Sequence, residues 1–166
     1  MKIGIVGGGT GGPAAALHFA RAGHAVTLFE RVVHPEPIGA GILLQPTGMA
    51  VLGRLGLQQR ILAHGSRIER LYGRNAGGRV VLDLAYSDLE PNLFGVGIHR
   101  GALFSALWDD CADEPNLSVV TGKEVASLAE TPESATLTFA DGSFASFDMV
   151  VVASGARSPL RASSRS

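Results

Sequence analysis

The alternation of apolar and polar residues predicts a strand–helix–strand unit at the start of the chain. Residues 2–6 form a short β-branched apolar run, which is typical of a buried strand. After a glycine-rich turn at 7–12, a helix is expected over 13–22, apolar nearly all round and opening with a proline, which the first turn of a helix accepts. A second apolar strand is expected over 25–29. This order is a βαβ unit, which implies parallel pairing of the two strands.

The rest of the chain predicts further strands and helices between loops. An irregular loop rich in proline and glycine is expected over 34–46. Helices are expected over 47–55 and 100–110, strands over 68–74, 79–84, 117–121 and 124–128, and a hairpin over 135–140 and 144–152 about the turn Asp141-Gly142. The tail over 162–166 is small and polar, and we expect it to be disordered. The expected fold class is α/β, a Rossmann-like nucleotide-binding fold with a parallel sheet, plus an antiparallel hairpin over 67–85.

Composition limits the class of protein further. With 166 residues, 46% of them hydrophobic and 17% charged, the chain has enough apolar mass for a core and the length of one ordinary domain. The formal net charge of −1 gives no electrostatic case for binding nucleic acid or an anionic membrane. No stretch approaches the length of a membrane span, and a single cysteine, Cys111, excludes an internal disulfide. We therefore expect a cytoplasmic protein without a metal site, in which Cys111 is a buried structural thiol.

The glycine-rich turn carries the first candidate chemistry. Gly7-Gly8-Gly9-Thr10-Gly11-Gly12 satisfies the pattern G-x-G-x-x-G, and it lies between a predicted strand and a predicted helix, as phosphate binding requires. The first glycine allows the tight turn, the second lets a pyrophosphate approach the backbone, and the third lets helix and strand pack closely. The free N–H groups and the dipole of the helix then hold the anion without a lysine. A turn that serves packing alone is the weaker interpretation.

An acidic residue follows at the spacing that this type of site requires. Glu30 ends the second predicted strand, 18 residues after Gly12, where a carboxylate can accept both hydroxyls of a ribose. Its charge disfavours a nucleotide with a 2′-phosphate, although Arg31 beside it softens that effect. These residues predict that the domain binds an adenine dinucleotide, and they leave FAD and NAD as alternatives.

Three later segments resemble conserved blocks of FAD-dependent aromatic hydroxylases. The first is Gly39-Ala40-Gly41-Ile42-Leu43-Leu44-Gln45-Pro46, the second is His99-Arg100 with Leu103 and Leu107, and the third is the run from Asp148 to Arg161. Their order and separation are similar to those in the p-hydroxybenzoate hydroxylase and salicylate hydroxylase group of flavoprotein monooxygenases. The resemblance covers residues 1–161 and implies a GR2-type FAD-binding fold, in which the hairpin over 67–85 is part of an incomplete substrate domain.

The resemblance also implies a FAD site and the residues that form it. Besides the pyrophosphate loop and the ribose carboxylate, it implies Arg31 at the ribose, Gly41, Ile42 and Leu43 near the flavin, Arg100 at the pyrophosphate or ribityl chain, Val125 beside the adenine, and Ser154 and Gly155 in the last block. For Arg100 a surface charge is the alternative, and for Val125 plain core packing. The resemblance assigns no catalytic residue and no metal ligand in this chain. It implies NAD(P)H as the electron donor.

Two departures from the family pattern change what we expect. Ser154 stands where the family motif D-G-x-x-S-x-x-R begins with aspartate, which weakens the case for NAD(P)H. Members of the group are also more than twice as long, and their later half holds a second FAD motif and most of the substrate-binding sheet. We therefore expect residues 1–166 to be the incomplete FAD-binding domain of a monooxygenase that hydroxylates a small aromatic substrate with NAD(P)H and O2, inactive alone.

Two other functional interpretations stay open. One is a non-catalytic module that binds FAD or NAD, which Ser154 favours, and the other is a remnant without ligand that oligomerisation keeps in solution. In either case the predicted strands over 68–74 and 79–84 form at most a two-stranded hairpin, whose edges and apolar face are exposed. We therefore expect self-association through this hairpin.

Overall fold

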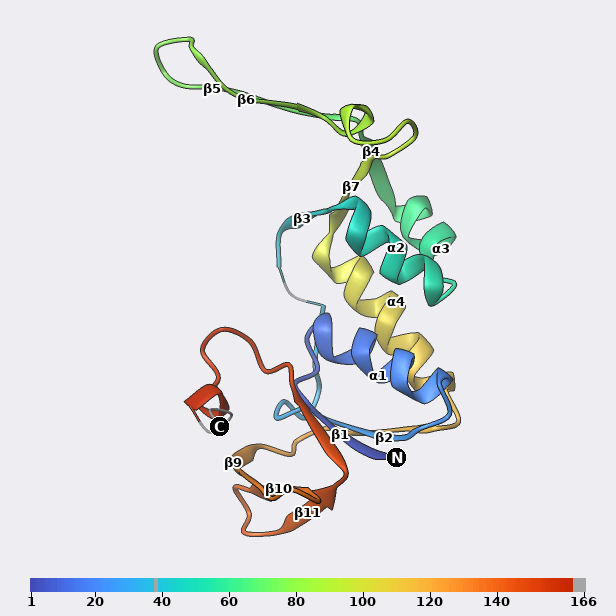
Figure 1. Cartoon of the computed structure of the whole chain (residues 1–166), viewed down its shortest axis with the longest axis vertical. Helices are drawn as coiled ribbons and strands as arrows, with labels where there is room; N and C mark the ends of the chain where they lie inside the picture. Colours follow the sequence, from blue (N-terminus) through green and yellow to red (C-terminus); the bar gives the residue numbers. More distant parts are fainter. Residues whose placement is uncertain (38, 163–166) are drawn as a thin grey trace. The chain divides into compact units, whose positions relative to one another are not determined.

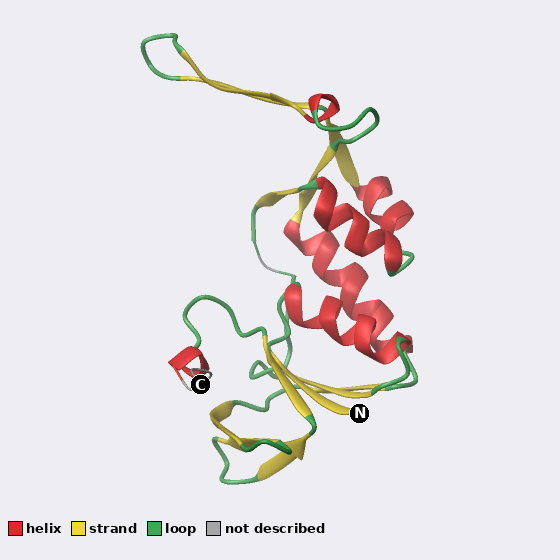
Figure 2. Cartoon of the chain, viewed as in Figure 1, coloured by secondary structure: helices red, strands yellow, loops and turns green. Residues whose placement is uncertain are grey.

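The computed structural model describes residues 1–37 and 39–162 of the chain. The chain packs into two compact units: Met1–Glu36 with the chain from Leu107 onward, and Pro37–Ala106. Figure 2 shows that helices and strands occur in both units. Each unit is described by itself below.

The first unit contains the parallel sheet that the sequence predicts. Its strand order is β12-β1-β2-β8, and every neighbouring pair is parallel. The βαβ prediction is thus confirmed, with α1 as the connection between β1 and β2 (Figure 1). The elements are β1 (Lys2–Val6), α1 (Gly11–Arg21), β2 (Ala25–Phe29), β8 (Leu117–Val120) and β12 (Met149–Val152).

Helix α1 packs its small apolar residues on this sheet. Ala16, Leu17 and Ala20 have no exposed surface, and neither do Ile3 of β1 and Leu28 of β2. The helix begins two residues earlier than predicted, because Gly11 and Gly12 already belong to its first turn. The end of the glycine loop is therefore also the start of the helix.

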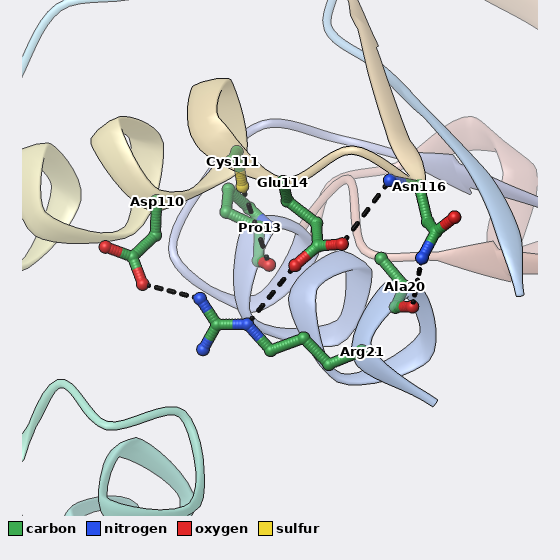
Figure 3. Close-up of polar contacts among 7 residues, drawn as sticks. All are labelled: Pro13, Ala20, Arg21, Asp110, Cys111, Glu114 and Asn116. Atoms are coloured by element: carbon green, nitrogen blue, oxygen red, sulfur yellow. Dashed lines mark hydrogen bonds and ion pairs between the residues drawn. The ribbon is translucent and has the colours of Figure 1, made fainter. Parts of the chain in front are cut away.

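The second half of α4 (Arg100–Asp113) and the residues just after it are bonded to α1 (Figure 3). The guanidinium group of Arg21 donates to Asp110 at 2.8 Å and to Glu114 at 3.4 Å, and the Asn116 amide donates to the Ala20 carbonyl at 3.3 Å. At the other end of α1, the Cys111 thiol lies 3.8 Å from the Pro13 carbonyl oxygen and is buried, so the prediction of a buried thiol is confirmed.

A second, antiparallel sheet completes the core of this unit. Its order is β11-β10-β9, formed by β9 (Val125–Glu130), β10 (Ala135–Phe139) and β11 (Phe144–Phe147). The ring of Phe29, at the end of β2, lies with its centroid 4.9 Å from that of Phe139 and 5.8 Å from that of Phe147. The two sheets thus share one apolar cluster.

The predicted strand over 144–152 is wrong, because it is two strands in different sheets. β11 pairs with β10, whereas β12 pairs in parallel with β1. Asp148 separates them: its N–H donates to the Lys2 carbonyl at 2.9 Å, and its carboxylate accepts the Lys2 N–H at 2.6 Å. These two hydrogen bonds fix Asp148 at the point where the chain leaves the antiparallel sheet and enters the parallel sheet.

The second unit contains a three-stranded antiparallel sheet that the sequence did not indicate. Its order is β3-β7-β4, so the expected irregular loop over 34–46 is wrong for residues 41–44. Buried Met49, Leu52 and Ile61 lie on the two helices that pack on β7. The elements are β3 (Gly41–Leu44), α2 (Pro46–Arg54), α3 (Gln58–His64), β4 (Gly65–Ile68) and β7 (Gly95–His99), of which only α2 was predicted as an element.

The predicted hairpin of this unit is present as a separate two-stranded sheet. β5 (Arg70–Arg74) and β6 (Val80–Ala85) pair antiparallel and form the extended ribbon of Figure 1, which is followed by the short helix η1 (Tyr86–Asp88). The strand predicted over 68–74 is thus divided, because residues up to Ile68 belong to β4 and pair with β7. The register places Leu71, Leu82 and Leu84 on one face of the ribbon.

The end of the described chain is the short helix η2 (Pro159–Ala162). The disordered tail expected over 162–166 otherwise lies outside the described residues. Among the helices that the structure describes, none has the length and apolar character to cross a membrane.

The burial of Cys111 predicts a pH dependence of stability. Burial raises the pKa of its thiol from about 9 to about 12. Between these values the unfolded chain loses the thiol proton and the native chain keeps it, so the free energy of unfolding falls as pH rises, by at most about 1.4 kcal/mol per pH unit. Urea unfolding from pH 8 to pH 11 measures this slope, and a Cys111→Ala variant should lack this part of it. Equal slopes for both proteins would contradict the prediction.

Candidate functional site

The first glycine of the loop joins the ends of two strands. Gly7 donates its N–H to the Phe29 carbonyl of β2 at 2.8 Å and has a φ of +111°, which favours glycine. A Cβ atom there would lie 2.7 Å from the Ala153 carbonyl oxygen, just after β12. Only glycine fits, and the loop is therefore fixed against the carboxyl ends of β2 and β12.

The peptide groups on both sides of Gly8 are bonded to side chains from distant parts of the chain. Its N–H donates to Oε2 of Glu30 at 2.6 Å, and its carbonyl accepts the indole N–H of Trp108 at 2.9 Å. A Cβ atom at Gly8 would lie 2.7 Å from Cζ2 of Trp108 and 2.9 Å from Oε2 of Glu30. Gly8 is thus enclosed by protein.

Of the other three glycines of the loop, the fold requires Gly12 but not Gly9 or Gly11. At Gly12 a Cβ atom would lie 1.8 Å from the Gly7 carbonyl oxygen, so only glycine allows helix and strand to approach this closely. At Gly9 and Gly11 a Cβ atom would meet nothing within 4 Å. The chain itself gives no steric reason for glycine at these two positions. A ligand lying against the loop backbone would give one, because it would occupy the space of a side chain.

The start of α1 carries backbone donors without acceptors. Among the described residues, no hydrogen bond uses the N–H groups of Gly9, Thr10, Gly11 and Gly12. The side chain of Thr10 makes no capping hydrogen bond, and the first turn contains no acidic residue. Neighbouring free N–H groups at the positive end of a helix dipole favour a bound phosphate. These residues therefore fit the pyrophosphate of a dinucleotide.

Glu30 lies beside this loop with a fixed carboxylate. Oε2 accepts the Gly8 N–H at 2.6 Å and Oε1 accepts the Val32 N–H at 2.9 Å. An ionised carboxylate has about four lone-pair positions, so each oxygen keeps capacity for a further donor such as a ribose hydroxyl. Arg31, the next residue, is exposed.

The segment after β12 forms a turn next to the glycine loop. A Cβ atom at Gly7 would lie 2.7 Å from Cα of Ser154. The Ser154 hydroxyl donates to the Ser158 hydroxyl at 2.6 Å, and the Gly155 carbonyl accepts the Ser158 N–H at 3.2 Å. The side chain at the position of the family aspartate is thus used to close the turn.

The remaining predicted residues are described within their own units. Val125 is buried in the apolar cluster with Leu128 and Phe139. This position agrees with core packing, the alternative to a contact with adenine. In the second unit, Arg100 opens α4 and donates its N–H to the Ala40 carbonyl at 3.2 Å. Gly41, Ile42 and Leu43 form β3 there and pair with His99, Ile98 and Gly97 of β7. The unit thus brings Arg100 next to the start of β3.

Sequence reasoning missed Trp108, which touches the loop. Its position on an amphipathic helix gives only a packing signal, because nothing local marks a contact with a residue 100 positions earlier. Across the described part of the chain, no group of histidine, cysteine and acidic residues is suited to a metal ion.

Two glycine substitutions separate ligand binding from folding. We expect Gly9→Ala to leave the melting temperature unchanged, since its methyl group meets no protein atom, and to weaken FAD binding by about tenfold, or about 1.4 kcal/mol. Gly12→Ala, the matched control, should destabilise the fold by about 1–3 kcal/mol through overpacking. Thermal unfolding and titration calorimetry measure both effects. A Gly9→Ala protein that binds FAD as the wild type does would contradict the assignment of the loop.

Comparison with known proteins agrees with this geometry. The family described as "FAD binding domain" matches residues 1–165. The chain is 32% identical over 167 residues to 3-amino-4-hydroxybenzoate 2-monooxygenase of Streptomyces cremeus, covering 98% of this chain and 42% of that protein. It is also 32% identical over 164 residues to 6-hydroxynicotinate 3-monooxygenase of Bordetella bronchiseptica, covering 96% and 42%.

Solved structures agree on the fold. A tetrameric form of 2-methyl-3-hydroxypyridine-5-carboxylic acid oxygenase has a TM-score of 0.82 at 24% identity, covering 98% of this chain and 41% of that one. The chain thus spans less than half the length of these relatives. The α/β fold class expected from the sequence is confirmed, and the chain belongs to the FAD binding domain family.

Proposed function

We propose that the loop of residues 7–12 holds the pyrophosphate of FAD and that Glu30, with Arg31 beside it, holds the adenosine ribose. The observation that carries this proposal is the run of free N–H groups from Gly9 to Gly12 next to a fixed carboxylate. The N–H groups and the helix dipole stabilise the phosphate charge, and the Glu30 oxygens accept the ribose hydroxyls. A 2′-phosphate on the ribose would be repelled by the charge of Glu30, so the site favours FAD over a nucleotide that carries a 2′-phosphate.

The other predicted residues complete the proposed site. Gly41, Ile42 and Leu43 are proposed for the flavin side, and Arg100 for the pyrophosphate or the ribityl chain. Val125 is proposed for the adenine, and Ser154 and Gly155 as the last block of the site. The buried side chain of Val125 leaves only its backbone for a contact with adenine. We propose residues 1–166 as one incomplete FAD-binding domain, with residues 67–85 as part of a substrate domain.

The activity we propose is that of a monooxygenase on a small aromatic substrate, of which this chain is the FAD-binding part. Support comes from the relatives, which are named as monooxygenases of an aminohydroxybenzoate and of a hydroxynicotinate. Bound FAD would supply the redox chemistry with O2, with NAD(P)H as the electron donor. Residues of this chain bind and orient FAD, and none of them is assigned a catalytic role. We propose the cytoplasm as its location.

A non-catalytic FAD or NAD module is the second candidate. Ser154 favours it, because its hydroxyl is bonded to Ser158 and a serine lacks the charge of the family aspartate.

The absorption spectrum of the purified protein tests FAD binding directly. We expect flavin bands at near-stoichiometric amount, and FAD in the material that acid releases. The reason is that the loop N–H groups proposed for the pyrophosphate and the carboxylate proposed for the ribose are both in this chain. If the protein is purified without flavin, added FAD should restore the bands. A colourless protein that also fails to bind added FAD would exclude the proposed site.

We also propose that two copies of the chain associate through the β5–β6 ribbon. Leu82 and Leu84 on its apolar face are 46% and 36% exposed. The opposite face carries the ion pair of Arg70 with Asp83 at 2.7 Å. Burial of the apolar face against a second copy would remove apolar surface from water, which stabilises association by about 25 cal/mol per Å².

Matched substitutions on the two faces of the β5–β6 ribbon test this association. Leu82→Lys places a charge on the apolar face and should shift the protein toward monomer in sedimentation velocity at micromolar concentration. Tyr72→Lys, on β5 in register with Asp83 and therefore on the face of the ion pair, is the control and should leave the sedimentation profile unchanged. A wild-type protein that sediments as a monomer would refute the proposal.

A further inference from the structure

We propose that Trp108 is a positioning residue of the dinucleotide site. Its indole holds the Gly8 peptide, and the Gly8 N–H in turn fixes the Glu30 carboxylate for the ribose. This inference rests on the proposed FAD binding and adds a residue to that site which neither the motif nor the family resemblance indicates. The sequence contains one tryptophan.

The Gly8 backbone is the link between the two side chains. Trp108 donates to its carbonyl at 2.9 Å, and its N–H donates to Glu30 at 2.6 Å. Gly8 lacks the side chain that would restrict its φ and ψ angles, so these bonds and the contact with the indole determine the orientation of its peptides. Without the indole, the Gly8 N–H is free to turn away from Glu30.

The indole itself comes from a helix held in place along α1. Leu107 and Cys111, on either side of Trp108, are each 1% exposed. Figure 3 shows the Cys111 thiol at the Pro13 carbonyl and the contacts of Arg21 with Asp110 and Glu114. These contacts lie at both ends of α1, so α4 presents Trp108 to the loop in one position.

Loss of the Trp108 bond to Gly8 would change how the Glu30 carboxylate is held. Its two oxygens are held by two backbone donors, Gly8 and Val32. Loss of the first leaves the carboxylate held on one side only, and the ligand must then order it on binding. Ordering of a long side chain and of a loop reduces affinity. Trp108 thus acts on the ribose position through Gly8, with no contact to the ligand required.

Hydrogen exchange tests the first step without any ligand. In a Trp108→Phe variant, which keeps an aromatic ring and removes the N–H donor, we expect faster exchange of the Gly8 amide. The Gly7 amide, bonded to the Phe29 carbonyl, should keep its rate. A Gly8 amide that exchanges at the wild-type rate would overturn the proposal. Phe19→Leu, near the carboxyl end of α1, is the control for a smaller side chain at a former aromatic position of the same unit.

A double-mutant cycle tests the second step, with ADP as the probe and calorimetry as the measurement. Trp108→Phe should weaken ADP binding by about fivefold, the effect of about one hydrogen bond, at unchanged melting temperature. In a Glu30→Ala background the same change should cost less than about twofold, because its effect passes through Glu30. An equal loss in both backgrounds would show a merely structural role and overturn the proposal.

The wild-type titration distinguishes the two proposals. If wild-type protein binds neither ADP nor FAD, the dinucleotide site is refuted and the positioning role falls with it. If wild type binds ADP and Trp108→Phe binds it equally well, only the positioning role is refuted.

Discussion

The contact of Gly12 with the Gly7 carbonyl is the constraint on which the rest of the site depends. A Cβ atom would lie 1.8 Å from that oxygen, so α1 can begin this close to the end of β1 only with glycine. The short connection brings Gly8 next to the end of β2, where Glu30 accepts its N–H. The free N–H groups and the fixed carboxylate of the proposed site thus follow from one close approach of helix and strand.

The parts of the fold that local sequence determines were predicted, and the parts that depend on distant partners were not. β1, α1 and β2 follow from an apolar run, a glycine turn and a second run within one βαβ unit, and they are confirmed. β3 and β7 are short and contain glycine, and they are strands because they pair with each other over a separation of more than 50 residues. The break at Asp148 has the same origin, since its partner is Lys2 at the other end of the chain.

The candidate site divides in the same way. The loop residues and Glu30 were predicted as site residues because their spacing is a local signature, and the structure places Glu30 beside Gly8. Trp108 was missed because a helical apolar pattern does not state which residue its side chain meets. The loop residues, Glu30 and Arg31 belong to one compact unit. The adenosine half of the dinucleotide is therefore a sufficient ligand for studying them.

The position of the single tryptophan has a consequence for spectroscopy. Trp108 is the only indole in the chain, and its N–H is bonded to the backbone of the glycine loop. Light absorbed by tryptophan and not by tyrosine therefore excites one fluorophore, located at the loop. Its emission depends on the polarity around the ring and on the bond to Gly8, so a change in the loop alters the colour and intensity of the whole protein's fluorescence. The chain thus carries its own optical reporter at the glycine loop of the proposed dinucleotide site.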